Sequence, residues 1–259
     1  WGGGILAQWG VLDFAGGIVV HATAGFAALA SVFYVGARVD KNSTPNSIPL
    51  VAIGSGLLWF GWYGFNAGSE VAVDFVTSTA FLNTDIAASF ATMSWVVIEW
   101  SREKKPKFVG LLTGSIAGLA TITPCAGFVP LWASPIIGTA AGIVCYLAVQ
   151  LKNKMKWDDA LDVWGVHGIG GVFGTILLGV FASKAVNSAG ADGLWFGDAS
   201  FFVKELVAVT IASVYAFIFT YLMLAIINKI TPVRVSESDE LTGLDVALHG
   251  EQAYDEGAL

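Results

Sequence analysis

The segment that decides the fold is DFAGGIVVHATAGFAALASVFYVGA, residues 13–37. From Phe14 to Ala37 it contains no Asp, Glu, Lys or Arg, and a helix needs roughly 20 mainly apolar residues to cross the hydrocarbon core of a membrane. Comparable apolar stretches recur along the chain at 48–68, 79–100, 108–123, 131–151, 161–182 and 199–230. Residues 1–230 are therefore predicted to form an all-α integral membrane protein, a polytopic bundle whose fourth span is short.

The composition agrees with this prediction. The hydrophobic residues make up 55% of the 259 residues, the charged residues only 13%, and the mean hydropathy is +0.69. Soluble domains carry about 25% charged residues, so a soluble fold of this size could not cover its surface. Residues 231–259 differ, because acidic side chains crowd there. We expect an acidic tail that is disordered or folds only on contact with the membrane domain or a partner.

The basic residues predict the orientation of the bundle. Of the 13 Lys and Arg residues, all except Lys184 and Lys204 follow the first, third, fifth or seventh span. Since Lys and Arg near span ends are retained in the cytoplasm, the first helix should enter from outside and the tail should be cytoplasmic. The protein is then a multi-pass protein of the cell membrane. An acidic outer rim that concentrates cations is expected from Glu70, Asp74, Asp192, Asp198 and Glu205.

Two histidines are predicted at membrane depth, His21 in the first span and His167 in the sixth. Ionisable residues are costly there and are candidates for function by default. An aspartate starts each span, Asp13 and Asp162, where a carboxylate can cap the helix. The two helices run in opposite directions, as in inverted-repeat transporters. A neutral imidazole both donates and accepts a hydrogen bond, so the pair can line a path for a small polar solute or pass a proton.

The second span ends in GWYGFNAGSE, residues 61–70. Its aromatic residues fit an interfacial aromatic belt. Asn66 and Ser69, however, place polar atoms beside Phe65, as expected of an aromatic constriction with hydrogen-bonding groups outside it. Trp1, on the same side, can offer its ring face to a small cation.

Other polar residues in the spans give weaker signals. Asp85 receives no role, and Glu99 is expected to pair with loop lysines. Cys125 and Cys145 lack a CxxC pattern or a nearby His, so we expect them to pack as small hydrophobic side chains and predict no metal site.

Six motifs in order resemble the ammonium transporter (Amt/Mep/Rh) family, in its Amt branch. They are WGGG at 1–4, DFAGGIVVH at 13–21, GWYGFNAGS at 61–69, TPCAGF at 123–128, DVWGVHGIGG at 162–171 and GLDVALHGEQAY at 243–254. The family's fold is an inverted-repeat transporter of eleven spans with the N-terminus outside. The chain, which opens with Trp1 rather than Met, is therefore interpreted as a fragment covering the fifth to eleventh spans and the tail.

The resemblance also implies function. The chain would belong to a transporter or channel, not an enzyme, that recruits ammonium outside, deprotonates it and conducts ammonia. Trp1 and Ser69 would recruit the cation, Phe65 would be one of two gate phenylalanines, and His21, His167 and Trp62 would line the pore. Structural support is expected from Asp13, Asp162 and Asn66. The implied partners are ammonium, ammonia and methylammonium, the lipid bilayer, two further copies in a homotrimer and a PII-type regulatory protein, with no cofactor and no nucleic acid.

Three alternatives stay open from the sequence. A membrane cytochrome subunit could use His21 and His167 as axial haem ligands. A sensor could bind ammonium and signal through the tail without transporting it. An intramembrane hydrolase is disfavoured because the chain has neither HExxH nor GxSxG.

Overall fold

The computed structural model describes residues 3–41, 44–252 and 254. A short helix α1 (Ile5–Gln8) precedes a π-helical turn η1 (Gly17–Ala22), which continues directly as α2 (Thr23–Val35). A second π-helical turn, η3 (Trp164–Gly168), likewise continues as α7 (Ile169–Phe181). The other long elements are α3 (Ile48–Ala67), α4 (Phe75–Glu103), α5 (Phe108–Ile122), α6 (Ala133–Met155) and α8 (Ala199–Ile227). Short elements complete the described chain: η2 (Gly68–Glu70), η4 (Leu194–Phe196), α9 (Glu237–Thr242) and η5 (Asp245–His249).

A helix thus occupies each of the seven ranges expected from the sequence. Within the residues that the structure describes, six of these helices are long and apolar enough to cross a membrane. The exception is α5, which has 15 residues and, at about 1.5 Å per residue, is shorter than a hydrocarbon core of ~30 Å. It ends where Pro124 follows Thr123, and the chain then turns through buried residues up to Val129 before α6 begins.

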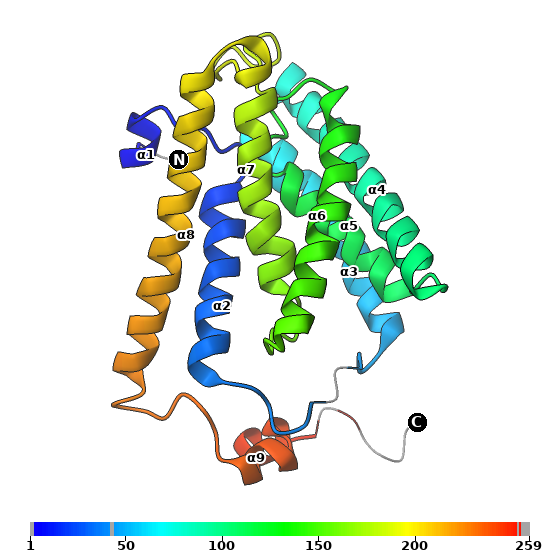
Figure 1. The fold of residues 1–259 in the computed structure, drawn as a ribbon, viewed down its shortest axis with the longest axis vertical. Coiled ribbons are helices and arrows are strands. Elements are labelled where there is room, and N and C mark those ends of the chain that lie inside the picture. The colour runs from blue at the N-terminus through cyan, green and yellow to red at the C-terminus, as the bar shows by residue number, and fades with distance from the viewer. Residues whose placement is uncertain (1–2, 42–43, 253, 255–259) are drawn as a thin grey trace.

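The long helices form a bundle whose axes follow the long dimension of the molecule (Figure 1). Helix α8 lies at one edge beside α2, while α4 lies at the opposite edge and packs on α5 and α6. Helix α7 packs against α8, α5 and α6, so it is enclosed by the bundle. The tail, with α9, lies below the end of α2 (Figure 1).

Side chains at the helix starts fix where two of the long helices begin. The Asp74 carboxylate accepts hydrogen bonds from the backbone N–H groups of Val76 and Thr77, so α4 begins at Phe75, before the predicted start of the span at 79. Asp198 caps α8 by accepting from Phe201 N. These caps satisfy N–H groups that a helix leaves without an intrahelical partner.

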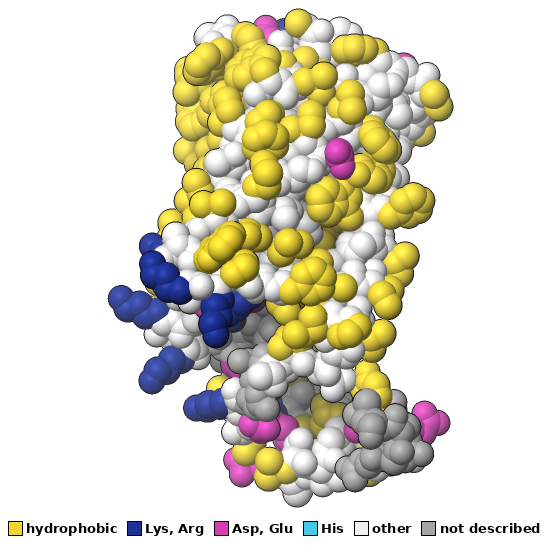
Figure 2. Space-filling model, turned by 90° about the vertical axis from the view of Figure 1, so that its right-hand side faces the viewer, with side chains coloured by type: hydrophobic (Ala, Val, Ile, Leu, Met, Phe, Trp, Pro, Cys, Tyr) yellow, Lys and Arg dark blue, Asp and Glu magenta, His cyan; other side chains and the backbone are white. Residues whose placement is uncertain are grey.

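The outer surface is that of a membrane protein. Figure 2 shows hydrophobic side chains over most of the height of one face, with Lys and Arg gathered toward the end that holds the tail. Large apolar side chains of α3 and α8 are exposed, among them Leu57, Phe60, Ile211 and Phe219. Such a surface would be unfavourable in water and suits lipid, so the prediction of a polytopic helical membrane protein is confirmed.

Two expectations about acidic residues were wrong. Glu205, predicted to lie in an outer acidic rim, is fully buried within α8, because its side chain faces the segment before η1 and accepts a hydrogen bond from Leu12 N. Glu99, predicted to pair with loop lysines, accepts a hydrogen bond from the backbone N–H of Lys107 at 3.2 Å. The Lys107 ammonium pairs with Glu103 instead.

The acidic tail is folded against the membrane domain. The Arg234 guanidinium donates to the carbonyl oxygens of Val35, the last residue of α2, and of Ala37 just after it, and pairs with Glu240 on α9. Glu240 also accepts from the backbone N–H of Val39 at 2.6 Å. Of the two expectations for the tail, folding on contact with the membrane domain is the one that its described residues follow.

Candidate functional site

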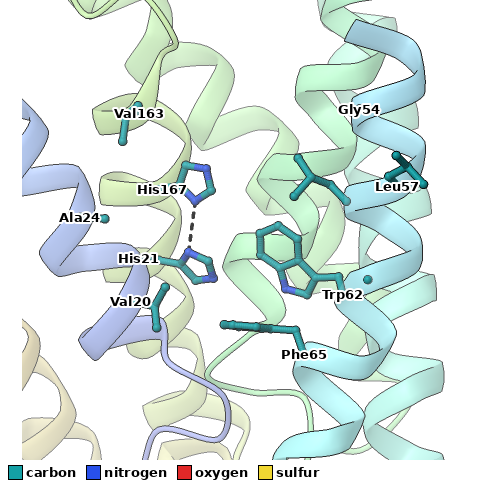
Figure 3. Close-up of a pocket in the computed structure, with 11 residues that line it drawn as sticks. Val20, His21, Ala24, Gly54, Leu57, Trp62, Phe65, Val163 and His167 are labelled. Atoms are coloured by element: carbon teal, nitrogen blue, oxygen red, sulfur yellow. Dashed lines mark hydrogen bonds between the residues drawn. The ribbon is translucent and has the colours of Figure 1, made fainter. Parts of the chain in front are cut away.

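The centre of the site is a pair of histidine side chains in direct contact. His21 lies in the last turn of η1, His167 lies in η3, and their Nδ1 atoms are 3.1 Å apart (Figure 3). His21 is only 3% exposed. Each histidine therefore sits in a π-helical turn, an element that widens the backbone locally and is frequent at functional sites. The structure brings together two residues that the sequence placed in separate spans.

Close backbone contact between the two helices explains why the rings meet. A Cβ atom added to Gly25 on α2 would lie 2.1 Å from the Cα of Gly168. A Cβ atom on Gly171 would lie 2.6 Å from the backbone nitrogen of Ala22. Only glycine allows helices to cross this closely. The crossing lies within about one turn of both histidines, so the glycines set the separation of the imidazoles.

Thr123 fixes which ring nitrogens carry protons. Its hydroxyl donates to the Leu119 carbonyl at 2.7 Å, accepts from Trp62 Nε1 at 3.0 Å and lies 3.2 Å from His21 Nε2. Since a hydroxyl has a single proton to donate, His21 Nε2 must be the donor in the last of these contacts.

The proton on His21 Nε2 determines the other tautomer as well. In the neutral ring His21 Nδ1 is then an acceptor, and His167 Nδ1 must donate to it. His167 Nε2 is left with the lone pair, and among the described residues no hydrogen bond to it is found. Two neutral rings in this arrangement have one open acceptor. The direct contact also leaves no room for a haem between the rings, which removes the support for the cytochrome alternative.

The histidines line a pocket of about 710 Å³ that is otherwise apolar. Trp62 is buried and stacks on His21 with ring centroids 5.3 Å apart and an angle of 18°. Phe65 lies 6.1 Å from the His21 ring, at the end of the pocket opposite Val163 (Figure 3). The remaining lining residues are Val20, Ala24, Gly54, Leu57, Leu58 and Gly61. The residues predicted to line a pore and the predicted gate residue Phe65 therefore line one pocket.

The two predicted aspartate caps have different outcomes. Asp13 accepts four backbone hydrogen bonds, from Gly16, Gly17, Ile18 and Val19, at 2.6 to 3.3 Å. It therefore holds the start of η1, as expected.

Asp162 does not cap the second helix. Asp159 does so instead, accepting from the backbone N–H groups of Val163 and Trp164 at 3.1 and 2.8 Å. Asp162 has a left-handed backbone with φ of 56° and pairs with the Lys152 ammonium at 2.6 Å. It supports the structure through that ion pair. The sequence expectation failed because it took the aspartate nearest to the apolar run, whereas the turn at 159–162 brings the earlier carboxylate to the helix start.

Of the two predicted recruitment residues, Ser69 lies near the Phe65 end. Ser69 donates its hydroxyl hydrogen to the Phe65 carbonyl at 2.7 Å. Asn66 is fully buried and donates to the Thr84 hydroxyl at 2.9 Å, which fits its expected supporting role. Trp1 lies outside the described residues, so its part in recruitment stays a prediction.

Sequence reasoning missed three functional or supporting residues. Thr123 was read only as the end of a span, although its place in TPCAGF marked it. Glu205 was assigned to a loop. Asp85 had no role, and the structure shows that it accepts from the Tyr63 hydroxyl at 2.5 Å, while Trp59 Nε1 donates to Tyr63 at 2.9 Å. No cluster of three or more potential metal ligands is found in the part of the chain that the structure describes.

Comparison with known proteins gives consistent results. The model of the Ammonium Transporter Family matches residues 1–254. The ammonium transporter of Bacillus subtilis is 48% identical over 98% of this chain and 63% of its own length. Ammonium transporter Amt1 of Archaeoglobus fulgidus is 46% identical over 98% of this chain and 65% of its own. The crystal structure of Candida albicans Mep2 matches with a TM-score of 0.87 and 36% identity, covering 92% of this chain and 56% of that one. The chain thus spans less than two thirds of these relatives.

Proposed function

This chain belongs to the ammonium transporter family. We propose that it carries the pore of a transporter that recruits ammonium outside the membrane and conducts it inward as ammonia. The observation that carries the proposal is the pair of neutral imidazoles with fixed tautomers in an otherwise apolar lumen. The relatives named above support ammonium as the substrate.

The chemistry of the lumen favours an uncharged substrate. Ammonium resembles potassium in size and charge, but it has N–H donors and a proton that it can lose. A bare cation in the apolar pocket beside Trp62 and Phe65 would lose its hydration shell, and the lining has few polar groups to replace the lost water. Ammonia avoids that cost, and one of its N–H groups can donate to the open Nε2 acceptor of His167. We therefore propose that deprotonation precedes passage along the histidines.

The Phe65 end is proposed as the entrance. Trp1 would hold the cation through its ring face and Ser69 through its hydroxyl. Phe65 would separate this cation site from the lumen, since its ring is 39% exposed and 5.7 Å from the Trp62 ring. Asp13 and Asn66 would support the two elements that meet there.

The wider setting is proposed from the family. We propose a homotrimer in the cell membrane, with the basic end and the tail in the cytoplasm, where a PII-type protein could bind. The gathering of Lys and Arg at the tail end supports this orientation (Figure 2). Lipid would cover the exposed apolar faces of α3 and α8 that the trimer leaves free.

Uptake of radiolabelled methylammonium separates a transporter from a sensor. The protein at its full natural length should restore uptake to cells that lack other ammonium carriers, and Trp62→Ala should abolish it because that ring forms the wall of the lumen beside both histidines. Lys229→Ala, at the end of α8, is the control and should leave uptake unchanged. Binding of ammonium without uptake would refute transport and favour the sensor.

Currents across proteoliposomes test whether the proton follows the histidines. If it does, ammonium should evoke a current that His21→Ala and His167→Ala each abolish. His249→Ala, an exposed histidine in the tail, is the matched control and should keep the full current. An unchanged current in both pore variants would show that the pair carries no proton.

A further inference from the structure

One buried carboxyl group has no part in the proposed transport. Glu205 lies in α8, is fully buried and contributes Oε1 as acceptor to the backbone N–H of Leu12 at 2.7 Å. Its Oε2 is also buried and has no hydrogen-bond partner among the described residues. An ionisable side chain at membrane depth is costly, so an apolar residue would be expected here unless the acceptor is needed.

The partner of Glu205 lies just before the histidine-bearing helix. Leu12 immediately precedes Asp13, whose carboxylate accepts from the backbone N–H of Gly16 and from the first three N–H groups of η1, the turn that contains His21. Residues 11–16 themselves form no helix or strand. Among the described residues the hydrogen bond found for Leu12 N is the one to Glu205. The position of η1 along the bundle thus depends on contacts that this segment makes with other elements.

Apolar packing extends the same contact. Ala208 and Val209, one turn after Glu205 on α8, pack with Val11, Ile18 and Ala22 in one buried cluster. Apolar packing is non-directional and permits sliding, whereas a hydrogen bond of 2.7 Å fixes the register of one element on the other. The two together attach the start of η1 to α8.

We propose that Glu205 is a positioning residue for the histidine pair, acting through Leu12 and Asp13 to set the place of His21 in the lumen. This inference rests on the proposed function for its effect on transport. The contact with Leu12 requires an acceptor oxygen at the position of Oε1. Glu205→Gln keeps that oxygen, whereas Glu205→Met has a similar length and removes it, leaving the part-buried N–H of Leu12 without this partner.

Hydrogen exchange tests the attachment without any transport assay. In purified protein at its full natural length, Glu205→Met should speed amide exchange in residues 11–22 about tenfold, while Glu205→Gln stays close to the unsubstituted protein. Ser213→Ala is the matched control, because Ser213 is buried on the same helix and, among the described residues, its hydroxyl bonds only to Val209 O. Equal exchange in Glu205→Met and the unsubstituted protein would overturn the proposal, as would faster exchange spread evenly over all helices.

Methylammonium uptake tests whether the position of η1 affects transport. Glu205→Met should lower methylammonium uptake about tenfold at normal expression, and Glu205→Gln should restore it. An equal loss in both variants would show that the charge rather than the acceptor matters, and would overturn the inference. If the unsubstituted protein takes up nothing, the proposed function fails, but the exchange result still decides whether Glu205 holds η1.

Discussion

The histidine site and the tail contact both hold distant segments of the chain together, but through different kinds of interaction. Both join segments that are far apart in the chain, His21 with His167 and Val39 with Glu240. At the histidine site the helix backbones touch through glycine, and the hydrogen bonds of the buried His21 side chain lie beside an otherwise apolar pocket. At the tail the contacts are ion pairs and backbone hydrogen bonds on exposed surface, with the Arg234 side chain 37% exposed.

This difference sets the rigidity of each region. Leaving a buried donor or acceptor unpaired costs about 1–3 kcal/mol, because water cannot replace the lost partner. An exposed ion pair contributes about 0.2–1 kcal/mol and weakens as salt is added. We therefore expect the geometry of the histidine site to tolerate little change, and the tail to detach and rebind with a small change in free energy.

The largest effect is expected where a side chain would separate the crossing helices. Gly25→Ala places a Cβ atom 2.1 Å from the Cα of Gly168, and neither backbone can move without shifting a histidine. We expect loss of methylammonium uptake and destabilisation by about 3 kcal/mol or more, since backbone shifts in a packed core cost about 1–3 kcal/mol or more. Thermal denaturation in detergent measures the destabilisation. Gly56→Ala on α3, where the added Cβ meets nothing within 4 Å, should be neutral. Equal behaviour of the two variants would contradict the crossing as the determinant of the site.

A smaller loss is expected from Thr123→Val. This change removes the acceptor for both Trp62 Nε1 and His21 Nε2 and leaves two donors unpaired beside the lumen. We expect destabilisation by about 2 kcal/mol and an exchange of His21 to its other tautomer, visible in ¹⁵N spectra of labelled histidine.

The control for Thr123 is Thr139→Val. Its hydroxyl bonds to the Pro135 carbonyl one turn earlier, as that of Thr123 bonds to Leu119, but it serves no other side chain among the described residues. It should change stability by well under 1 kcal/mol and leave the histidine spectrum unaltered. A Thr123→Val spectrum identical to that of the unsubstituted protein would refute the tautomers derived above.

The sequence predicted the histidine site better than the contacts that support it. Apolar runs, and the rare polar residues within them, can be recognised from the sequence alone. The sequence could therefore predict the helical ranges and the site residues His21, His167, Trp62 and Phe65. The Asp13 cap could be found because it depends on residues within six positions. Local patterns are read directly from the chain.

The errors concern contacts whose partner is set by the fold. Glu205 was placed in a loop, since nothing in the sequence shows that Leu12 lies beside it, 193 residues away. Asp162 was preferred to Asp159 because a left-handed residue in the turn cannot be read from an aspartate alone. The role of Thr123 depends on two donors from other helices. Such residues become identifiable only when the helices are packed.

The tail contact should break with a modest effect. Arg234→Ala removes the hydrogen bonds to Val35 O and Ala37 O and the ion pair with Glu240. We expect faster cleavage within residues 231–252 under limited proteolysis, by about threefold to tenfold, with the thermal midpoint of the bundle unchanged. Lys229→Ala, nearby at the end of α8, is the control. Resistance of the Arg234→Ala tail to cleavage would show that other contacts hold it.

The smallest effect is expected from the ion pair that joins the loop after α2 to the loop before η3. Arg38 donates to both oxygens of Asp158 and holds the pKa of that carboxyl below its usual range. Because the folded pKa lies below the unfolded one, the pair contributes stability above about pH 4 and loses it as the pH falls through the folded pKa. Raising the pH from 5 to 8 should not weaken it. Amide exchange of residues 36–41 in Asp158→Asn should be about twofold to threefold faster than in the unsubstituted protein at pH 7, with the ratio approaching one as the pH falls through the folded pKa of Asp158 and in high salt. Glu237→Gln, an exposed acid in α9, should give a ratio of one throughout. A ratio that persists below the folded pKa of Asp158 would mean that the backbone hydrogen bond from Arg38 N, rather than the charge pair, holds this loop. The contrast with the more buried histidine site would then be one of geometry and not of solvent exposure.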